Sequence, residues 1–284
     1  MEYGFHLQKE AYRESSVDRS IRILRRLSQH SNLADGEAVK GYLSKLDWSL
    51  GTKEIASNVL YSFYKFRGVS FTKPRYRRID KVPFLPTEAE IDQLIGGCSR
   101  RVGSFLLFLK DTGARAGEAW SVRWTDLDLE QRTVRVTPEK NSNARLLKLS
   151  LRLTERLGTL PRNSQKVWGD GTLNHFGRLF QKQRKRIASK LGNPRIQSIH
   201  FHTLRHWRGT VEYARTKDIV HVSRLLGHKS IQNTLRYIQL QTTEDDAFHC
   251  KAARTLSEVT ALVETGFEFV CKLEDGVQVF RRRK

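Results

Sequence analysis

Cysteine is scarce in this chain of 284 residues, and its three copies lie far apart. Cys98, Cys250 and Cys271 form no CxxC pair, which argues against a zinc ribbon. An odd number of widely separated thiols also gives no support for a disulfide framework. We therefore expect reduced thiols in a cytoplasmic protein.

Long apolar segments are also missing. The longest apolar run, near Phe105–Leu109, is far too short to cross a bilayer. The first residues are polar and lack the apolar stretch of a secretory signal. We therefore expect neither a membrane span nor a membrane location. Hydrophobic residues still make up 38% of the chain, which is ample for a core, and the length allows two domains.

Acidic residues are heavily outnumbered. The chain has 30 Asp and Glu against 51 Lys and Arg, which gives a formal net charge of +21 and a pI near 10.2. A surplus of this size is hard to explain as solvated surface alone and argues for a polyanionic partner. Nucleic acid is the favoured partner, ahead of an anionic membrane surface or an acidic protein.

The periodicity of residues 1–80 predicts a small helical domain. Apolar residues recur at helical spacing from about Ser15 to His30, and arginines lie around them. Further helices are expected near Glu37–Leu46 and after Gly51-Thr52. A plain bundle with a solvated basic face and a DNA-clamping module fit this pattern about equally well.

Prolines and basic residues alternate between Phe71 and Pro86, which predicts an extended linker. A basic extended segment suits a strap along a phosphate backbone, although an ordinary solvated linker fits as well. The candidate DNA-contacting residues of this segment are Lys73, Arg75, Arg77 and Arg78.

A second, larger domain is expected from residue 87 onward. Alternating residues at 133–136 and 145–151 predict a hairpin with Lys140 near its tip, and Val167-Trp168 is a candidate third strand. A helix over about Leu173–Leu191 carries a dense basic stripe, which is either a solvated face or a phosphate-contacting one. The candidate DNA-contacting residues of this helix are Arg178, Lys182, Arg184, Lys185 and Arg186.

Histidines, an arginine and a tyrosine gather on short predicted helices between His200 and Tyr237. The motifs are His202-Thr203-Leu204-Arg205-His206, Leu226-Gly227-His228 and Tyr237 itself. A phenol has a pKa near ~10, so it is a poor nucleophile at neutral pH unless its neighbours activate it. Cations and imidazoles beside a lone tyrosine are suited to that task.

With Thr112-Gly113-Ala114-Arg115-Ala116-Gly117-Glu118 and Lys140, these motifs form one ordered set. Over about Phe84–Leu240 the sequence resembles the catalytic domain of the tyrosine recombinase (phage integrase) family. Residues 1–80 resemble the family's helical core-binding domain, and the C-terminal segment resembles the tails of archaeal integrases. The resemblance implies a mainly α fold with a small antiparallel β-sheet, in a two-domain tyrosine recombinase architecture.

The expected domains are a helical core-binding domain over 1–80, with a linker to about 86, and an α+β catalytic domain over 87–284. The implied function is a site-specific DNA recombinase or integrase, an enzyme of archaeal mobile genetic elements. It would cleave and rejoin strands through a 3′-phosphotyrosyl intermediate, without ATP, cofactor or metal. The implied partners are double-stranded DNA with a specific site and other copies of the chain, assembled as a tetramer in the synapse.

The resemblance also implies a role for each site residue. Tyr237 would be the nucleophile, Arg115 and Arg205 would hold the scissile phosphate, and Lys140 would be the general acid for the leaving 5′-oxygen. Lys148 competes with Lys140 for that last role, because hairpin registers slide. His202 and His228 would complete the pocket, with His202 as the leading candidate to take the phenolic proton. Glu118 and His206 would have supporting roles, and Gly117 departs from the Ser that is frequent in the family.

Three alternatives stay open at this point. Lys217–Tyr237 also fits a helix-turn-helix, so a non-catalytic sequence-specific DNA-binding regulator would explain the charge. A type IB topoisomerase-like nicking and closing activity would use similar residues. The set His200, His202 and His206 suggests a metal site, but Thr203 follows His202 where a metalloprotease helix needs Glu.

The C-terminal segment predicts one helix and one hairpin. The helix covers Ser257–Glu264, and the strands Phe267–Lys272 and Val277–Phe280 flank a turn at Glu274-Asp275-Gly276. Arg281–Lys284 is expected to be a mobile tail. By analogy with the family, the segment would pack on a neighbouring protomer, and folding back on its own domain is the alternative.

Overall fold

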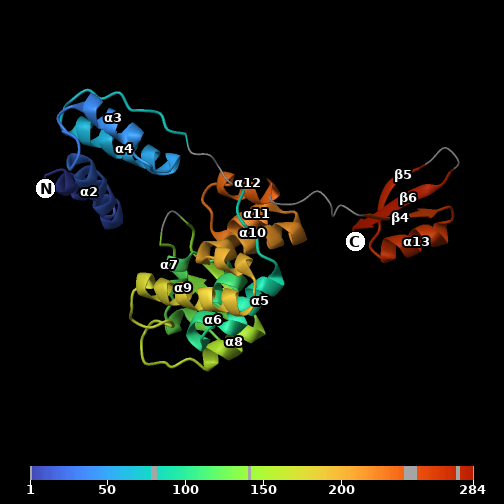
Figure 1. The fold of residues 1–284 in the computed structure, drawn as a ribbon. Coiled ribbons are helices and arrows are strands. Elements are labelled where there is room, and N and C mark those ends of the chain that lie inside the picture. The colour runs from blue at the N-terminus through green and yellow to red at the C-terminus, as the bar shows by residue number, and fades with distance from the viewer. Residues whose placement is uncertain (1, 78–81, 140–141, 240–247, 273–275, 284) are drawn as a thin grey trace. The chain divides into compact units, whose positions relative to one another are not determined.

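The computed structural model describes residues 2–77, 82–139, 142–239, 248–272 and 276–283, and the chain forms two compact units, 1–81 and 82–284 (Figure 1). Helices dominate both units, and the second unit adds two small antiparallel sheets. The mainly α fold class with a small antiparallel sheet is therefore confirmed. Arg78 and Lys140 lie outside the described residues.

The first unit is built from helices around one apolar core. They are α1 (Glu2–Lys9), α2 (Glu14–Ser28), α3 (Gly36–Lys45) and α4 (Leu50–Phe66). Leu27, Leu43 and Leu60 are fully buried in this core. Tyr3 of α1, a helix that the sequence analysis did not predict, packs edge-on against Phe63 with ring centroids 5.4 Å apart.

The beginning of the predicted linker packs on α4. Phe71 stacks on Tyr64 at 4.4 Å between ring centroids, and Ser57 Oγ donates to the carbonyl of Pro74 over 2.7 Å. Residues 71–77 have no regular secondary structure, as the prolines indicated. The predicted linker is therefore anchored to the first unit through its first residues.

In the second unit, α6 (Arg100–Thr112) runs through the centre of the core, because most of its side chains are buried. Helices α5 (Glu88–Gly97), α8 (Leu151–Gly158) and α10 (Phe201–Thr216) make extensive contacts with it. The remaining helical elements are α7 (Ala116–Trp120), η1 (Trp124–Asp126), α9 (Leu173–Lys190), η2 (Pro194–Ser198), α11 (Ile219–Leu226) and α12 (Gln232–Gln239). Phe105 of α6 makes edge-on contacts with Trp120, Trp168, Phe176 and Phe201, at 5.0 to 6.1 Å between ring centroids.

A three-stranded antiparallel sheet lies beside these helices, in the order β1-β2-β3. Its strands are β1 (Leu127–Asp128), β2 (Thr133–Val136) and β3 (Arg145–Lys148). The prediction that Val167-Trp168 forms the third strand is wrong, because β1 takes that place. Trp168 is instead buried against Phe105, and its indole N–H donates to the carbonyl of Ala119 over 2.7 Å.

The C-terminal segment forms a second sheet, in the order β4-β6-β5, with one helix. Its elements are β4 (Phe248–Ala253), α13 (Leu256–Glu264), β5 (Glu268–Lys272) and β6 (Gln278–Arg283). Leu262, Phe267 and Phe280 form its small core. The prediction of a mobile tail from Arg281 is wrong for residues 281–283, because they belong to the central strand β6 and pair with β4.

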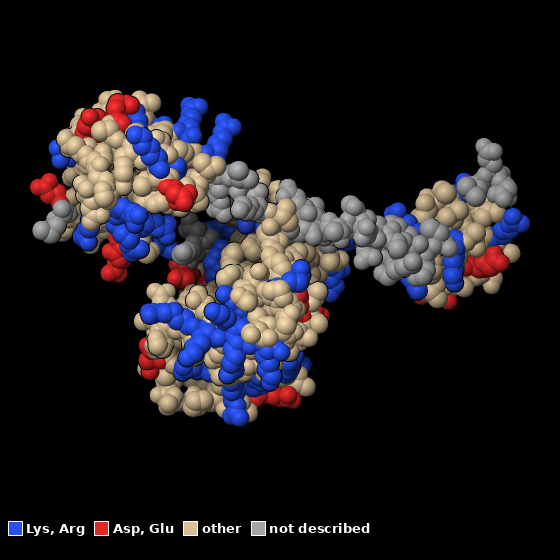
Figure 2. Space-filling view, viewed as in Figure 1, with Lys and Arg blue, Asp and Glu red and all other residues tan. Residues whose placement is uncertain are grey.

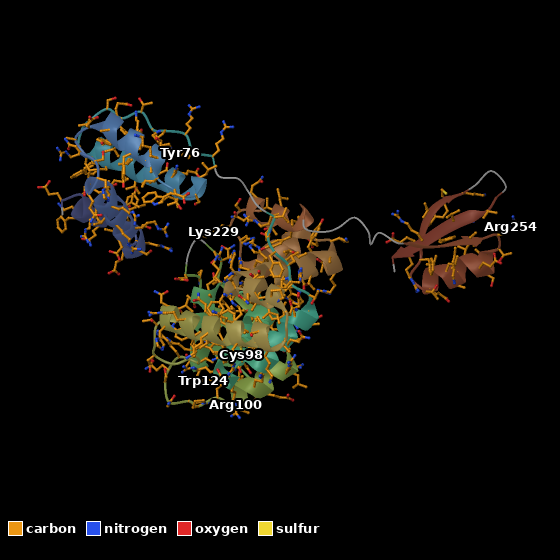
Figure 3. All side chains as sticks on the ribbon, viewed as in Figure 1. Tyr76, Cys98, Arg100, Trp124, Lys229 and Arg254 are labelled. Carbon is orange, nitrogen blue, oxygen red and sulfur yellow. The ribbon has the colours of Figure 1, made fainter. Side chains whose placement is uncertain are left out.

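Among the described residues, no helix combines the length and apolar character that a membrane crossing requires. Cys98 ends α5 with its thiol buried (Figure 3), and burial raises its pKa to about 11. Such a thiol is a packing group at neutral pH, not a nucleophile.

Replacing Phe105 by Ala should lower the free energy of unfolding of the second unit by about 3–5 kcal/mol, because it removes the ring on which four aromatic side chains converge. Urea unfolding followed by tryptophan fluorescence measures this. Four of the five tryptophans lie in the second unit: Trp120, Trp124, Trp168 and Trp207. Leu151→Ala is the control, since Leu151 is 58% exposed and its loss should change the stability by less than about 0.5 kcal/mol. Equal effects of the two substitutions would contradict the central position of Phe105.

Candidate active site

Arg205 of α10 lies between the ends of two other helices. Its side chain is buried, with the residue 2% exposed, and it donates to the carbonyls of Gly113 (2.7 Å) and Leu226 (2.8 Å). These carbonyls lie at the C-terminal ends of α6 and α11, where the helix dipoles are negative. Burial, followed by the charge of Arg115, lowers the Arg205 pKa to about 10, so the guanidinium is still charged at neutral pH.

Glu118 ties Arg115 to the hairpin. Its carboxylate, 1% exposed, accepts from Arg115 Nη1 (3.0 Å), Arg145 Nη2 (2.7 Å) and Ser142 Oγ (2.6 Å). It also accepts from the backbone N–H of Arg115, which starts α7. Burial pushes the pKa of Glu118 upward, but these hydrogen bonds and the Arg145 charge outweigh it and hold the pKa at about 2.

His228 follows the left-handed Gly227 (φ 68°) that ends α11. Its Nδ1 is 2.8 Å from the hydroxyl of the buried Thr234, and the backbone N–H of Asn143 donates to Gly227 over 3.0 Å. Burial, then the charges of nearby arginines, lowers the His228 pKa to about 3, so the ring is neutral at pH 7. The hairpin loop and the His228 turn are thus joined through the backbone.

Tyr237 of α12 is 1% exposed and lies against α10. Its Oη is 3.5 Å from Nδ1 of His206, and its ring is parallel to that of His228 at 6.5 Å between centroids. Burial raises the Tyr237 pKa, although Arg205, Arg236 and Arg115 pull it downward. The phenol is therefore protonated at neutral pH in the free protein.

The fold thus gathers most of the predicted site around α10. Arg115 comes from the turn before α7, His202, Arg205 and His206 from α10, His228 from the turn after α11, and Tyr237 from α12. Lys140 lies outside the described residues, while Ser142, two positions later, bonds to Glu118 in the site. Its competitor Lys148 pairs with Thr133 at the far end of β3, three residues from Arg145 and about 10 Å along the strand.

Three contributors to the site escaped the sequence analysis. In the sequence, Arg145 looks like an ordinary strand residue. Thr234 and Gly209 look like ordinary residues inside helices. Their significance depends on contacts across the fold: Arg145 with Glu118, Thr234 with His228, and Gly209 with the Tyr237 ring.

Lys and Arg side chains gather over the face of the second unit that carries α9 (Figure 2). Arg178, Lys182 and Lys185 are exposed there. The half-buried Arg184 instead donates to the carbonyl of Ile199 over 2.6 Å, and Arg186 donates to that of Gly97 over 3.3 Å. The stripe therefore combines solvent-exposed residues with residues whose hydrogen bonds also stabilise the fold. The linker candidates Lys73, Arg75 and Arg77 are likewise exposed.

No cluster of His, Cys, Asp and Glu suited to a metal ion occurs among the residues that the structure describes. His200, one member of the suggested metal set, instead has Arg184 Nη1 2.8 Å from its Nδ1. A cation held at this nitrogen leaves it unsuited to bind a metal.

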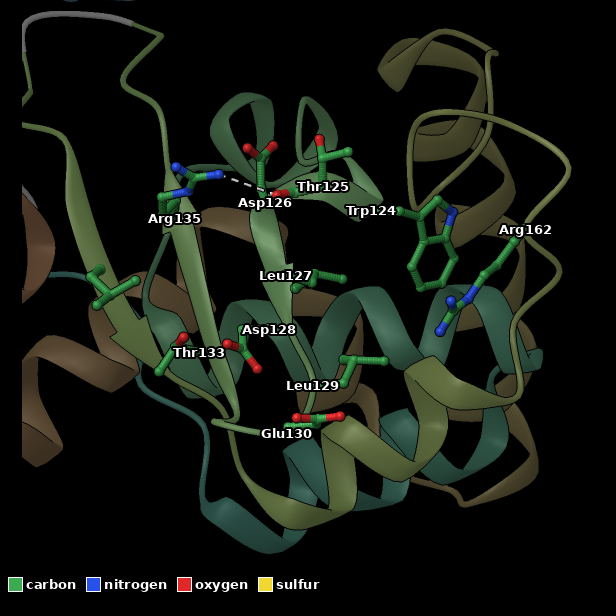
Figure 4. A pocket seen from close by; sticks show the side chains of 11 residues that line it. Trp124, Thr125, Asp126, Leu127, Asp128, Leu129, Glu130, Thr133, Arg135 and Arg162 are labelled. Atoms are coloured by element: carbon green, nitrogen blue, oxygen red, sulfur yellow. Dashed lines mark hydrogen bonds between the residues drawn. The ribbon is translucent and has the colours of Figure 1, made fainter.

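A pocket of about 650 Å³ lies away from the site, around η1 and β1 (Figure 4). Arg162 stacks over Trp124 at 4.9 Å, and Arg135 donates to the carbonyl of Thr125 over 3.2 Å. None of the candidate site residues lines it.

Comparisons with known proteins show the family of this chain. Residues 86–244, more than half of the chain, match the phage integrase family. The tyrosine recombinase XerA of Saccharolobus solfataricus is 28% identical over 201 residues, which cover 70% of this chain and 66% of the relative. The shufflon-specific DNA recombinase of Escherichia coli is 29% identical over 132 residues, which cover 46% of this chain and 33% of the relative. The chain thus spans less than two thirds of the length of these relatives.

Among solved structures, the Tn1549 transposon integrase in complex with transposon right-end DNA is similar in fold. The TM-score is 0.67 at 15% sequence identity, over 93% of this chain and 98% of that chain. The chain belongs to the phage integrase family.

Proposed function

We propose that this protein is a site-specific DNA recombinase that cleaves and rejoins DNA strands through a 3′-phosphotyrosyl intermediate. The observation that carries the proposal is the packing of Tyr237 on the helix that bears Arg205 and two histidines, within one chain. Double-stranded DNA is the partner, and the relatives named as recombinases and the integrase bound to DNA support this choice.

Arg115 and Arg205 would hold the scissile phosphate. A phosphodiester attacked by a phenol gains charge on its non-bridging oxygens as it passes through a pentavalent arrangement. Guanidiniums offer these oxygens permanently charged, planar contacts, and fixed donors of this kind contribute about 10²–10³ in rate. Arg205 is rigidly held for this task, because two helix ends already fix its Nη atoms.

The leaving 5′-oxygen needs a proton, and we assign that role to Lys140. Glu118, Arg145 and Ser142 fix the base of its loop, and Asn143 fixes the loop to the His228 turn. A Cβ at Gly117 would meet the carboxylate of Glu139, the neighbour of Lys140, but this exposed and flexible side chain can move aside.

Both units would contact the DNA. Residues 1–80 would act as the core-binding clamp and the basic linker to about 86 as a strap along the phosphate backbone, with α9 adding further phosphate contacts. Because Tyr237 is buried in the site of its own chain, we propose attack within the same subunit. The strand exchange would take place in a tetramer of this chain in the cytoplasm.

Tyr237→Phe should abolish the covalent protein–DNA adduct while leaving DNA binding unchanged, because it removes only the nucleophilic oxygen. The measurement uses a library of nicked duplexes that lose a short strand on cleavage, so that the adduct accumulates and survives denaturant. A gel shift without denaturant is the control for binding. A persistent adduct in this variant would place the nucleophile elsewhere, and a wild-type protein without any adduct would favour the regulator alternative.

Lys140→Ala should slow cleavage of ordinary DNA by about 10²–10⁴, the usual contribution of a general acid. A substrate with sulfur in place of the bridging 5′-oxygen should restore the rate, because a thiolate leaves without a proton. Lys148→Ala is the matched control and should keep its activity, since Lys148 lies at the far end of β3. The opposite pattern, with Lys148→Ala inactive and Lys140→Ala active, would overturn the assignment.

Glu118→Gln should destabilise the second unit by ~3 kcal/mol at pH 7, from a folded pKa of about 2 against an ordinary value of 4.5. The pKa is depressed in the folded state, so this stabilisation is complete above pH 4.5 and is lost as the pH falls toward 2. The difference in unfolding free energy between wild type and variant should therefore shrink in that window. Glu37→Gln, which breaks an exposed pair with Lys40, should cost less than about 1 kcal/mol. A difference for Glu118 that stays constant from pH 7 to pH 3 would refute the role of its charge.

A further inference from the structure

The phenol of Tyr237 has one hydrogen-bond partner among the described side chains, and it is His206. Its Oη is 3.5 Å from Nδ1 of His206, and no hydrogen bond joins Tyr237 to His202 or His228. Catalytic hydrogen bonds are frequently longer in free enzymes than in substrate complexes, so this spacing suits a proton transfer that tightens on DNA binding.

Gly209 fixes the ring of Tyr237 at this place. It follows His206 by three residues, so both lie on the same face of α10. A Cβ added at Gly209 would stand 2.7 to 2.9 Å from three atoms of the Tyr237 ring. The ring therefore lies directly on the helix backbone, and this contact sets the position of Oη beside His206.

The three histidines near Tyr237 have different electrostatic surroundings. The pKa of His202 is lowered by burial and then by Arg205, Arg115 and Arg236, so this ring lies near both arginines of the phosphate clamp. His228 also feels Arg205 and Arg115, and Thr234 holds its Nδ1.

The ring of His206 has fewer cationic neighbours. Burial comes first among the causes that lower its pKa to about 4, followed by His202, Arg236 and Arg205, without Arg115. Its ring packs edge-on against His202 at 4.5 Å between centroids and also contacts Tyr237. His206 thus lies beside the phenol, whereas His202 lies near the arginines that would hold the phosphate.

We propose that His206, and not His202, accepts the phenolic proton of Tyr237 during cleavage, with Gly209 as the positioning residue that seats the tyrosine. This inference rests on the proposed recombinase function. The O–H bond of Tyr237 breaks as its proton moves to Nδ1 of His206, and the oxygen forms the bond to phosphorus. The bond from phosphorus to the 5′-oxygen breaks, and that oxygen takes a proton from Lys140. Religation runs the same steps in reverse, and His206 returns the proton to the phenol.

The charges around His206 and Tyr237 favour proton transfer only after DNA has bound. His206 faces His202 and Arg205 from its own helix and Arg236 and Tyr237 from α12, so its ring is neutral and its Nδ1 is free to accept a proton. An imidazolium would be disfavoured among these cations in the free protein. A bound phosphodiester would offset them, so the proton moves only when the phenol oxygen begins to bond to phosphorus.

The deciding experiment replaces Tyr237 by 3,5-difluorotyrosine, whose phenol is more acidic and depends less on a base. The probe is a nicked duplex that the wild-type chain cleaves, and the rate of adduct formation is the readout. His206→Ala should slow the reaction about 10²-fold or more with tyrosine, and the fluorinated residue should recover most of that loss. His202→Ala should slow adduct formation equally with tyrosine and with 3,5-difluorotyrosine, because this substitution weakens the contacts to the phosphate and not the activation of the phenol. His206→Asn serves as a second variant, and a gel shift verifies that each variant still binds DNA.

Recovery of His202→Ala instead of His206→Ala, or full activity of His206→Ala with tyrosine, would overturn the proposal. A wild-type protein that forms no adduct with any duplex of the library would instead refute the recombinase function. Gly209→Ala tests whether the contact with Gly209 positions the ring of Tyr237. This substitution should slow adduct formation at least tenfold, while DNA binding is kept. Gly96→Ala in α5 is its matched control, since no atom lies within 4 Å of a Cβ added there, and its rate should not change. Equal rates for both glycine variants would contradict a positioning role for Gly209.

Discussion

The site depends on one buried charge. Arg205 is almost fully enclosed, and such a cation is tolerated only where polar partners replace its lost hydration. Its partners are the carbonyls of Gly113 and Leu226. The turn carrying Arg115 begins directly after Gly113, and the turn carrying His228 follows Leu226. One side chain of α10 therefore fixes both the turn that carries Arg115 and the turn that carries His228.

Steric limits at the same place explain the glycine before Arg115. Gly113 has a positive φ of 61°, and a Cβ there would lie 2.7 Å from a methyl group of Leu226. The left-handed conformation and the close approach both require a residue without a side chain. Packing therefore restricts the motif Thr112-Gly113-Ala114-Arg115 at Gly113, in addition to the chemical role proposed for Arg115.

Cations prevail over anions in this part of the molecule. Arg115, Arg145, Arg205 and Arg236 lie within electrostatic reach of His228, and the nearby histidines are neutral in the free protein. Glu118 is the carboxylate that balances them, through Arg115 and Arg145. A site with this excess of cations is suited to an anionic group, such as the phosphodiester of the proposed DNA partner.

The sequence predicted the helical character, and its ordered motifs named most of the residues that the fold brings together around α10. It did not predict α1, whose eight residues give only a weak periodic signal, or β4, which becomes a strand by pairing with β6. Trp168 was misplaced in a strand because an apolar pair fits a strand and a core position equally well. The sequence analysis favoured His202 as the acceptor of the phenolic proton, and the proposal of His206 instead depends on how α12 packs across α10.

The central claim is that Tyr237 becomes covalently joined to DNA. The most direct test is mass spectrometry of the adduct formed by the wild-type chain, after digestion of the DNA and protein, to locate the residue that carries the nucleotide. The account predicts a nucleotide attached through its 3′-phosphate to Tyr237. A nucleotide on any other residue, or one attached through a 5′-phosphate, would contradict it.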